Sequence, residues 1–202
     1  MNKKTFIGKT KEEAITLALE GLNASIDEVV IIEKEEKKGL FNKKCEIEAI
    51  TKSDLNHEIK TFVLNVVKNM GIEAKIELKN RQEAPIFNLI TNESSILIGK
   101  NGKTIEALQV VTTQMLNREL NDYYRFIIDV NDYRSKRKSR LERLAKTTAK
   151  DVSRTKTEAK LEAMNSFDRR IIHNALTNNK YVYTESVGED PNRCVVIKPK
   201  EM

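Results

Sequence analysis

The 202-residue chain contains no tryptophan, and its aromatic residues make up only 5% of the total. We therefore do not expect a nucleic-acid surface built from many stacked rings. Histidine is also scarce, since only His57 and His173 occur. The sequence has no HExxH motif, no P-loop, no nucleophile elbow and no metal-spaced cysteines. We therefore expect no enzyme, no metal site and no other cofactor.

Cysteine is limited to Cys45 and Cys194, which lie far apart and form no CxxC pair. Free thiols in a reducing compartment are the favoured interpretation. No apolar run approaches the length of a membrane span. The basic start of the chain lacks the apolar segment of a signal peptide. We therefore expect a cytoplasmic, globular protein without a membrane span.

Positive charge is concentrated in one segment of the chain. Residues 132–156 contain ten Lys and Arg against three Asp and Glu, a net charge of +7, whereas the whole chain carries +6. A local basic stripe indicates a polyanionic partner. A narrow apolar stripe in the same segment predicts a helix over about 132–154. The binding candidates on it are Arg134, Lys136, Arg137, Lys138 and Arg140. A solvated helix face without a partner is the alternative.

The first 51 residues predict a β-α-β-β module. Thr10 and Glu13 have the spacing of a capping box, which marks the start of its helix. Two strand-like segments follow, and a basic loop, KKGLFNKK, joins them. Beyond residue 51 a polar stretch, in which Ser53 or Asp54 can cap the next helix, indicates a domain boundary.

Residues 52–131 predict the element order α-β-β-α-α-β. Between the two central helices lies ILIGKNGKTIEAL (96–108), in which Gly99 and Gly102 enclose a Lys-Asn pair. Bare backbone and the amides at a helix N-terminus favour bound anions, and the nearby lysines add positive charge. An ordinary helix–helix turn with glycine caps is the alternative.

This order and this motif closely resemble a KH domain of the bacterial topology, type II. The resemblance implies that the glycine turn clamps the sugar-phosphate backbone of about four nucleotides. The residues of this turn are Ile98, Gly99, Lys100, Asn101, Gly102 and Lys103. Residues 53–131 contain nine basic and ten acidic residues, so their own affinity for RNA should be weak. A scaffold that uses the KH unit for dimerisation therefore stays open.

Residues 132–202 predict a helix-led domain with a small sheet. In MNSFDRRIIHNAL (164–176), Asn165 or Ser166 can cap a helix. Arg169 and His173 are four residues apart and share one helix face. Two strand-like segments, 180–187 and 193–199, follow.

This segment resembles the R-three-H domain, which binds single-stranded nucleic acid. The resemblance implies that Arg169 binds a phosphate with its forked guanidinium and that His173 orients it, with Arg170 as a further contact. A purely structural role for His173, paired to Asp168 or Arg169, is the alternative. The resemblance also makes residues 158–162 a short strand, although their periodicity alone would pass for a helix.

The three modules together resemble the Jag (KhpB) family over nearly the whole chain. The predicted fold class is α+β, with modules at 1–51, 52–131 and 132–202 in series. The family implies a cytoplasmic bacterial regulator that binds single-stranded RNA and is linked to cell elongation and division. It also implies a small stand-alone KH protein as a partner. A homodimer stays open, and so does single-stranded DNA, because the sequence gives no view of a 2′-hydroxyl contact.

Overall fold

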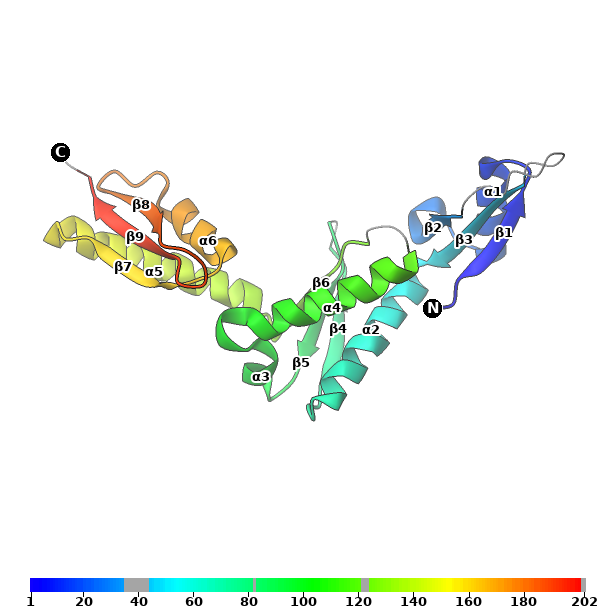
Figure 1. Ribbon diagram of the computed structural model, residues 1–202, viewed down its shortest axis with the longest axis horizontal. Helices are drawn as coiled ribbons and strands as arrows, with labels where there is room; N and C mark the ends of the chain where they lie inside the picture. Colours follow the sequence, from blue (N-terminus) through cyan, green and yellow to red (C-terminus); the bar gives the residue numbers. More distant parts are fainter. Residues whose placement is uncertain (35–43, 82, 121–123, 201–202) are drawn as a thin grey trace. The chain divides into compact units, whose positions relative to one another are not determined.

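The computed structural model describes residues 1–34, 44–81, 83–120 and 124–200 (Figure 1). The KKGLF stretch of the predicted basic loop, residues 37–41, lies outside the described residues. The chain divides into two compact units. Unit 1 comprises residues 1–97 and 104–128, and unit 2 comprises residues 98–103 and 129–202. Three small sheets and their helices confirm the predicted α+β class.

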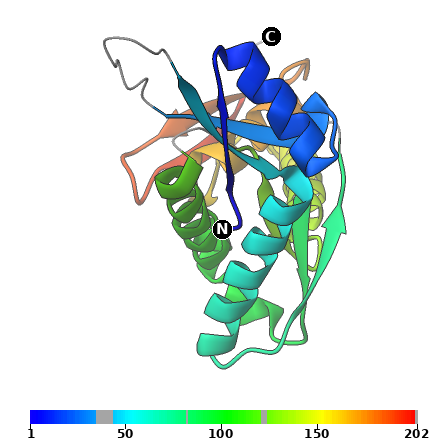
Figure 2. The ribbon, with the colours of Figure 1, turned by 90° about the vertical axis from the view of Figure 1, so that its right-hand side faces the viewer.

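The N-terminal sheet has the order β1-β3-β2, with both neighbours antiparallel to β3. Helix α1 packs against β1 and β3, where its small Ala14 and Ala18 meet Ile47 (Figure 2). The predicted cap of α1 is confirmed, because the Thr10 hydroxyl accepts a hydrogen bond of 3.2 Å from the Glu13 amide. The elements are β1 (Lys4–Gly8), α1 (Lys11–Leu22), the 3-10 turn η1 (Ile26–Glu28), β2 (Val29–Glu33) and β3 (Cys45–Thr51).

The second sheet has the order β4-β5-β6, and its elements follow the predicted order α-β-β-α-α-β. Thr51 ends β3 and also caps α2, since its hydroxyl accepts a hydrogen bond of 3.0 Å from the Asp54 amide. The predicted caps at Ser53 and Asp54 are therefore wrong. The elements are α2 (Lys52–Asn69), β4 (Lys75–Lys79), β5 (Ile86–Ile90), α3 (Ser94–Ile98), η2 (Lys100–Gly102), α4 (Lys103–Leu120) and β6 (Ile127–Val130).

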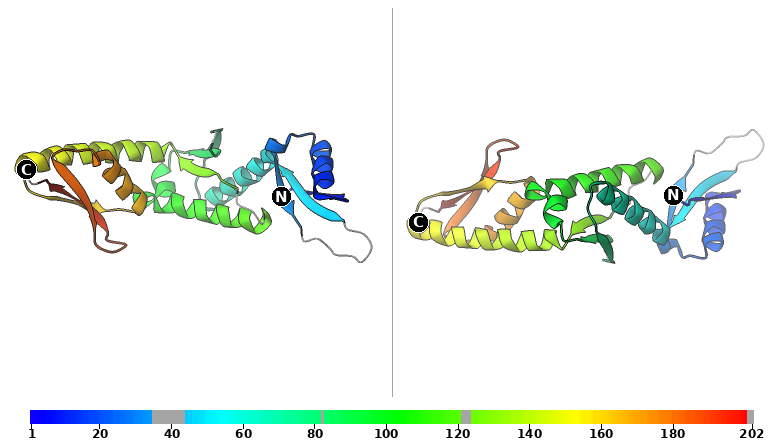
Figure 3. Two further views of the ribbon diagram at one scale, coloured as in Figure 1. Left: turned by 90° about the horizontal axis from the view of Figure 1, so that it is seen from above. Right: turned by 90° about the horizontal axis from the view of Figure 1, so that it is seen from below.

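The third sheet has the order β7-β9-β8, with β9 antiparallel to both neighbours. Helices α5 and α6 pack against it, and both views of Figure 3 show α5 alongside its strands. Leu141 and Val152 of α5 and Ile172 of α6 form a core with Val195 and Ile197 of β9. The elements are α5 (Tyr133–Thr155), β7 (Ala159–Ala163), α6 (Ser166–Leu176), β8 (Val182–Val187) and β9 (Cys194–Pro199).

Strand β7 confirms the expectation that came from the family resemblance rather than from periodicity. Its backbone pairs with the central strand, with Ala159 opposite Ile197 and Lys160 opposite Val196. The partner strand thus decides the conformation of a segment whose local pattern suits a helix equally well. In the described ranges, none of the helices has the length and apolar composition that a membrane crossing requires.

Candidate nucleic-acid interface

The glycine turn has a backbone that glycine alone accommodates well at two positions. Gly99 has φ 70° and ψ −178°, a region that is essentially restricted to glycine. Gly102 has φ 85° and is buried. A Cβ atom added there would lie 3.2 Å from Cε1 of Tyr133 on α5. Gly99 is therefore required by conformation, and Gly102 by conformation together with the close approach of a ring.

The two lysines of the turn, Lys100 and Lys103, have exposed side chains. Between them Asn101 has φ 55°, in the left-handed region that asparagine tolerates better than most residues. The turn therefore presents two exposed positive charges on a short backbone of fixed conformation. Such an arrangement attracts phosphate groups, although two exposed lysines alone are not specific for any one anion.

The basic residues of α5 fall on two sides of the helix. Leu141, Ala145 and Val152 are buried against the sheet, and the opposite face carries exposed cations. An open hollow of about 320 Å³ on this face is lined by Ser135, Lys136, Ser139, Arg140 and Arg143. Hydroxyl donors and three cations around one hollow form an environment suited to a phosphate. We call these five residues the α5 hollow.

Arg137 has a different environment from the other basic residues of α5. Its Nε and Nη2 atoms lie 3.1 and 3.0 Å from Oδ2 of Asp168 on α6. The side chain of Asp168 is only 5% exposed and that of Arg137 is 20% exposed. The same Nη2 atom lies 3.5 Å from Oδ1 of Asn101 in the glycine turn. The structure therefore places Arg137 between the turn and α6 rather than in the α5 hollow.

The helix α6 begins as predicted, because the side chain of Asn165 accepts a hydrogen bond of 2.8 Å from the Asp168 amide. Arg169 is almost wholly buried, with 8% of its side chain exposed. Its Nη2 atom lies 4.0 Å from Oδ1 of the exposed Asp190. Its buried Nε has no hydrogen-bond partner among the described residues. Arg170, by contrast, is exposed.

His173 is held by two hydroxyl groups of β8. Its Nδ1 lies 2.6 Å from Oγ1 of Thr184, and its Nε2 lies 2.8 Å from Oγ of Ser186. Burial lowers the pKa of the His173 ring below its ordinary value, and the neighbouring charge of Arg169 lowers this pKa further. A neutral ring satisfies both hydroxyls, since one nitrogen donates and the other accepts. His173 thus joins α6 to β8 and gives its motif partner Arg169 a fixed neighbour.

The roles of three neighbours of the candidate residues were missed from the sequence. Asp168 pairs with Arg137 rather than with His173, and Tyr133 covers Gly102; in both cases the two partners come from distant segments. Phe167 was missed because a single aromatic residue at the start of a helix is an ordinary sequence feature. Phe167 is 60% exposed and directly precedes the buried Asp168 in sequence. The only local indication of a role for Asp168 was its position three residues after the Asn165 cap, because an acidic side chain stabilises the N-terminus of a helix.

All fourteen residues selected from the sequence lie in unit 2, because residues 98–103 cluster with residues 129–202. Direct contacts join Asn101 to Arg137, and Asp168 joins Arg137 to α6. A hollow of about 810 Å³ in unit 1 is lined by residues between Leu64 and Asn92 and includes none of the candidates. No group of three or more His, Cys, Asp or Glu side chains within the described ranges is arranged to hold a metal ion.

Comparison with known proteins gives two family matches. A model described as the R-three-H domain matches residues 139–199, and a model described as the Jag N-terminus matches residues 6–50. Residues 51–138 lie between the two matches.

Several curated proteins are similar to this chain. A protein of Clostridium symbiosum named RNA-binding protein KhpB is 39% identical over 206 residues, which cover 99% of this chain and 93% of that protein. A Bacillus subtilis protein of the same name is 31% identical over 207 residues, covering 99% of this chain and 100% of its own length. One from Lactiplantibacillus plantarum is 38% identical over 136 residues, 67% of this chain and 42% of that protein.

Proposed function

This chain belongs to the KhpB family of RNA-binding proteins, and we propose that it binds single-stranded RNA on unit 2, mainly through the phosphate backbone. The observation that carries this proposal is the clustering of the glycine turn with α5 and α6 in one compact unit. Three elements that carry cationic side chains and are distant in sequence can thereby contact one strand of RNA. Weak contacts that act within one molecule raise the apparent affinity of each other.

The contacts differ in kind among these elements. Lys100 and Lys103 attract phosphates as exposed point charges, and the α5 hollow offers hydroxyl donors together with cations. Arg169 is too buried to extend into solvent. We assign it a phosphate that takes the place of the Asp190 carboxylate, where the guanidinium gains a closer acceptor than one at 4.0 Å.

A base contact is proposed for Phe167. Its ring is the most exposed of the large apolar side chains described in unit 2. Single-stranded RNA is commonly recognised by stacking of its bases on such rings. Because one ring reads one base, we expect modest sequence preference and affinity that depends mainly on phosphates.

The test is filter binding of the full chain to a single-stranded RNA at several salt concentrations. Lys100→Gln with Lys103→Gln should lower the affinity and reduce the slope of log affinity against log salt by about 1.4, since each phosphate contact contributes roughly 0.7. The control, Lys52→Gln with Lys60→Gln, removes the same charge from exposed positions in unit 1. Equal slopes for the two variants would rule out the turn as a phosphate contact.

Further parts of the proposal come from the family. We propose a cytoplasmic location, a role in cell elongation and division, and a small stand-alone KH protein as partner. We also propose that the chain has no catalytic activity, which a nuclease assay with added divalent metal tests. Single-stranded DNA of the same sequence serves as the comparison ligand, and equal affinity would favour a general single-strand binder. A scaffold that acts by homodimerisation through its KH part is the second candidate, because residues 53–131 have no excess of positive charge.

A further inference from the structure

We propose that Arg137 is a positioning residue, which holds the glycine turn in a fixed place beside α6 and does not itself bind phosphate. This inference rests on the proposed RNA-binding function of unit 2. It specifies how the two phosphate-binding elements, the turn and the R-three-H helix, keep a constant spacing.

Arg137 is paired with Asp168 in a largely buried ion pair. Two nitrogens of one guanidinium lie within 3.1 Å of a carboxylate oxygen whose side chain is 5% exposed. If Arg137 turned away toward a phosphate, a buried carboxylate would be left without its cation, which is strongly unfavourable. The positive charge of Arg137 is therefore already compensated inside the protein. The exposed cations of the α5 hollow are the better phosphate ligands.

Arg137 also contacts the glycine turn. Nη2 of Arg137 lies 3.5 Å from Oδ1 of Asn101, at the tip of the turn. One helical turn earlier on α5, the ring of Tyr133 lies so close to Gly102 that a Cβ atom would approach it to 3.2 Å. Two successive turns of α5 thus meet the glycine turn, one at a side-chain oxygen and one at the backbone. The turn is therefore held against α5 at two neighbouring residues.

The same ion pair attaches Arg137 to α6. Asp168 receives Arg137 through its carboxylate, and its backbone amide donates to Asn165 at 2.8 Å, which caps the same helix. Arg169 directly follows Asp168 on α6, and His173 lies one helical turn beyond Arg169. A continuous series of contacts therefore runs from Asn101 through Arg137 and Asp168 to the R-three-H motif. Motion of the glycine turn relative to α6 has to break this series.

A positioning role and a contact role give opposite expectations for a lysine at this position. An ammonium group retains the charge, so a phosphate contact would survive Arg137→Lys. Arg137→Lys also removes the planar guanidinium, which contacts Asp168 and Asn101 at the same time, so a positioning role would be lost in this variant. Neutralisation by Arg137→Gln should also leave the salt slope unchanged if Arg137 meets no phosphate.

The experiment compares Arg137→Lys, Arg137→Gln and the matched control Arg140→Gln in the full chain. Amide hydrogen exchange of residues 99–103 is measured without RNA, and RNA affinity is measured against salt. Both Arg137 variants should exchange faster at the turn by about tenfold, the equivalent of one lost charge-assisted hydrogen bond. They should lose a similar factor in affinity with an unchanged slope. Arg140→Gln should leave the exchange unchanged and lower the slope by roughly 0.7.

Wild-type exchange and affinity in Arg137→Lys would overturn the proposal, and so would a reduced slope in Arg137→Gln. Faster exchange with no RNA binding by any protein, including the wild type, would support the positioning role and defeat the proposed function instead. If circular dichroism shows that the Arg137 variants do not fold, Asp168→Asn takes their place, because it removes the carboxylate that holds Arg137 without changing a residue of the glycine turn. Its turn should exchange faster at an unchanged salt slope, and wild-type exchange would again overturn the proposal.

Discussion

Gly99 and Gly102 are both explained by the protein itself, before any ligand is considered. Gly99 has a glycine-only backbone conformation, and Gly102 lies under the ring of Tyr133 with φ 85°. A substitution at either position strains the folded chain whether or not RNA contacts the turn. The exposed Lys100 and Lys103 are therefore the residues that report on binding.

Phe167 provides a test of base stacking at a single residue. We expect Phe167→Ala to weaken RNA binding by about 5- to 150-fold, because stacking of one base is worth about 1–3 kcal/mol. The loss should be absent with an abasic sugar-phosphate strand, which retains the charge and lacks the rings. Fluorescence titration of Phe167→Trp gives a direct readout, because the chain has no other tryptophan. RNA should quench its emission.

The control for this prediction is Tyr181→Ala, which removes another ring of unit 2 that is 53% exposed. It should retain wild-type affinity. If Phe167→Ala loses affinity equally for RNA and for the abasic strand, the ring supports the fold of the site and does not stack on a base.

His173 should make stability depend on pH in a defined direction. Its pKa in the folded protein is lowered by burial and by Arg169, so the unfolded chain takes up a proton before the folded chain does. The contribution of His173 to the free energy of unfolding is then fully present above the ordinary histidine pKa of about 6.5. It is lost as the pH falls toward the lower pKa that the ring has in the folded protein. Urea midpoints at about pH 7.5 and about pH 5.5 should therefore differ.

His173→Gln should reduce this difference, since it removes the titrating ring and retains a donor and an acceptor for Thr184 and Ser186. His57→Gln, at the exposed second histidine, should retain it. A larger difference in His173→Gln than in the wild type would contradict the sign of the shift.

At the scale of elements, α5 combines two roles on different sides. One side packs on the sheet and fixes the helix, and the opposite side carries the α5 hollow. Arg137 belongs to a third direction, toward α6. A basic segment with a net charge of +7 is therefore not one uniform binding surface.

We expect Lys136→Gln, Arg140→Gln and Arg143→Gln together to lower the salt slope by about 2, since each phosphate contact contributes roughly 0.7. The matched control removes three exposed lysines from unit 1 through Lys9→Gln, Lys52→Gln and Lys60→Gln. Filter binding over a range of salt concentrations measures both slopes. If the two triple variants have the same slope, the α5 hollow is only a solvated face.

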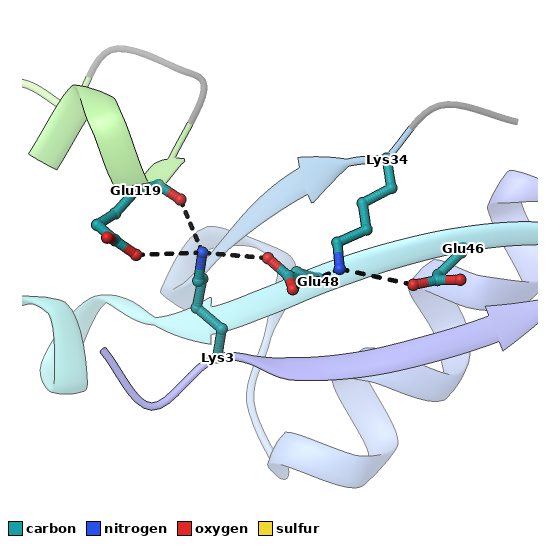
Figure 4. A network of polar contacts seen from close by, with 5 residues as sticks. All are labelled: Lys3, Lys34, Glu46, Glu48 and Glu119. Atoms are coloured by element: carbon teal, nitrogen blue, oxygen red, sulfur yellow. Dashed lines mark hydrogen bonds and ion pairs between the residues drawn. The ribbon is translucent and has the colours of Figure 1, made fainter.

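At the scale of the whole molecule, the N-terminal sheet is joined to α4 by a network of charged side chains (Figure 4). Lys3 donates a hydrogen bond of 2.8 Å to the backbone carbonyl of Glu119, near the end of α4. Its Nζ also lies 3.2 Å from the carboxylate of Glu48 on β3, and Lys34 lies 2.7 Å from the same carboxylate. These lysines lower the pKa of Glu48, with the hydrogen bond from Lys34 as the largest cause.

Lys3→Gln should destabilise unit 1 by about 1 kcal/mol, because Lys3 and Glu48 are mostly shielded from solvent and the carbonyl of Glu119 loses a charged donor. Urea unfolding measures the loss, and the exposed neighbour Lys4→Gln is the control. RNA affinity should remain at the wild-type value in both variants, since the proposed contacts lie in unit 2. A loss of affinity in Lys3→Gln alone would instead make the N-terminal module part of the binding site.

Most elements of this protein could be predicted from local patterns. Thr10 and Asn165 cap their helices as expected, because a cap needs only residues that are adjacent in sequence. The cap of α2 was misplaced, since Thr51 serves both the end of a strand and the start of a helix. The strand at 159–163 required information beyond periodicity, because its pairing with β9 is a long-range contact.

By itself the sequence determined the order of the elements, the concentration of positive charge in one helix, and the glycine turn with its two lysines. These features depend on spacing and composition within short segments. Tertiary structure alone decided that Arg137 is paired, that Arg169 is buried, and that Gly102 lies under Tyr133. Arg137 meets partners 31 and 36 residues away, on α6 and in the glycine turn. Burial and ion pairing follow from which distant segments pack together, and no local spacing specifies that choice.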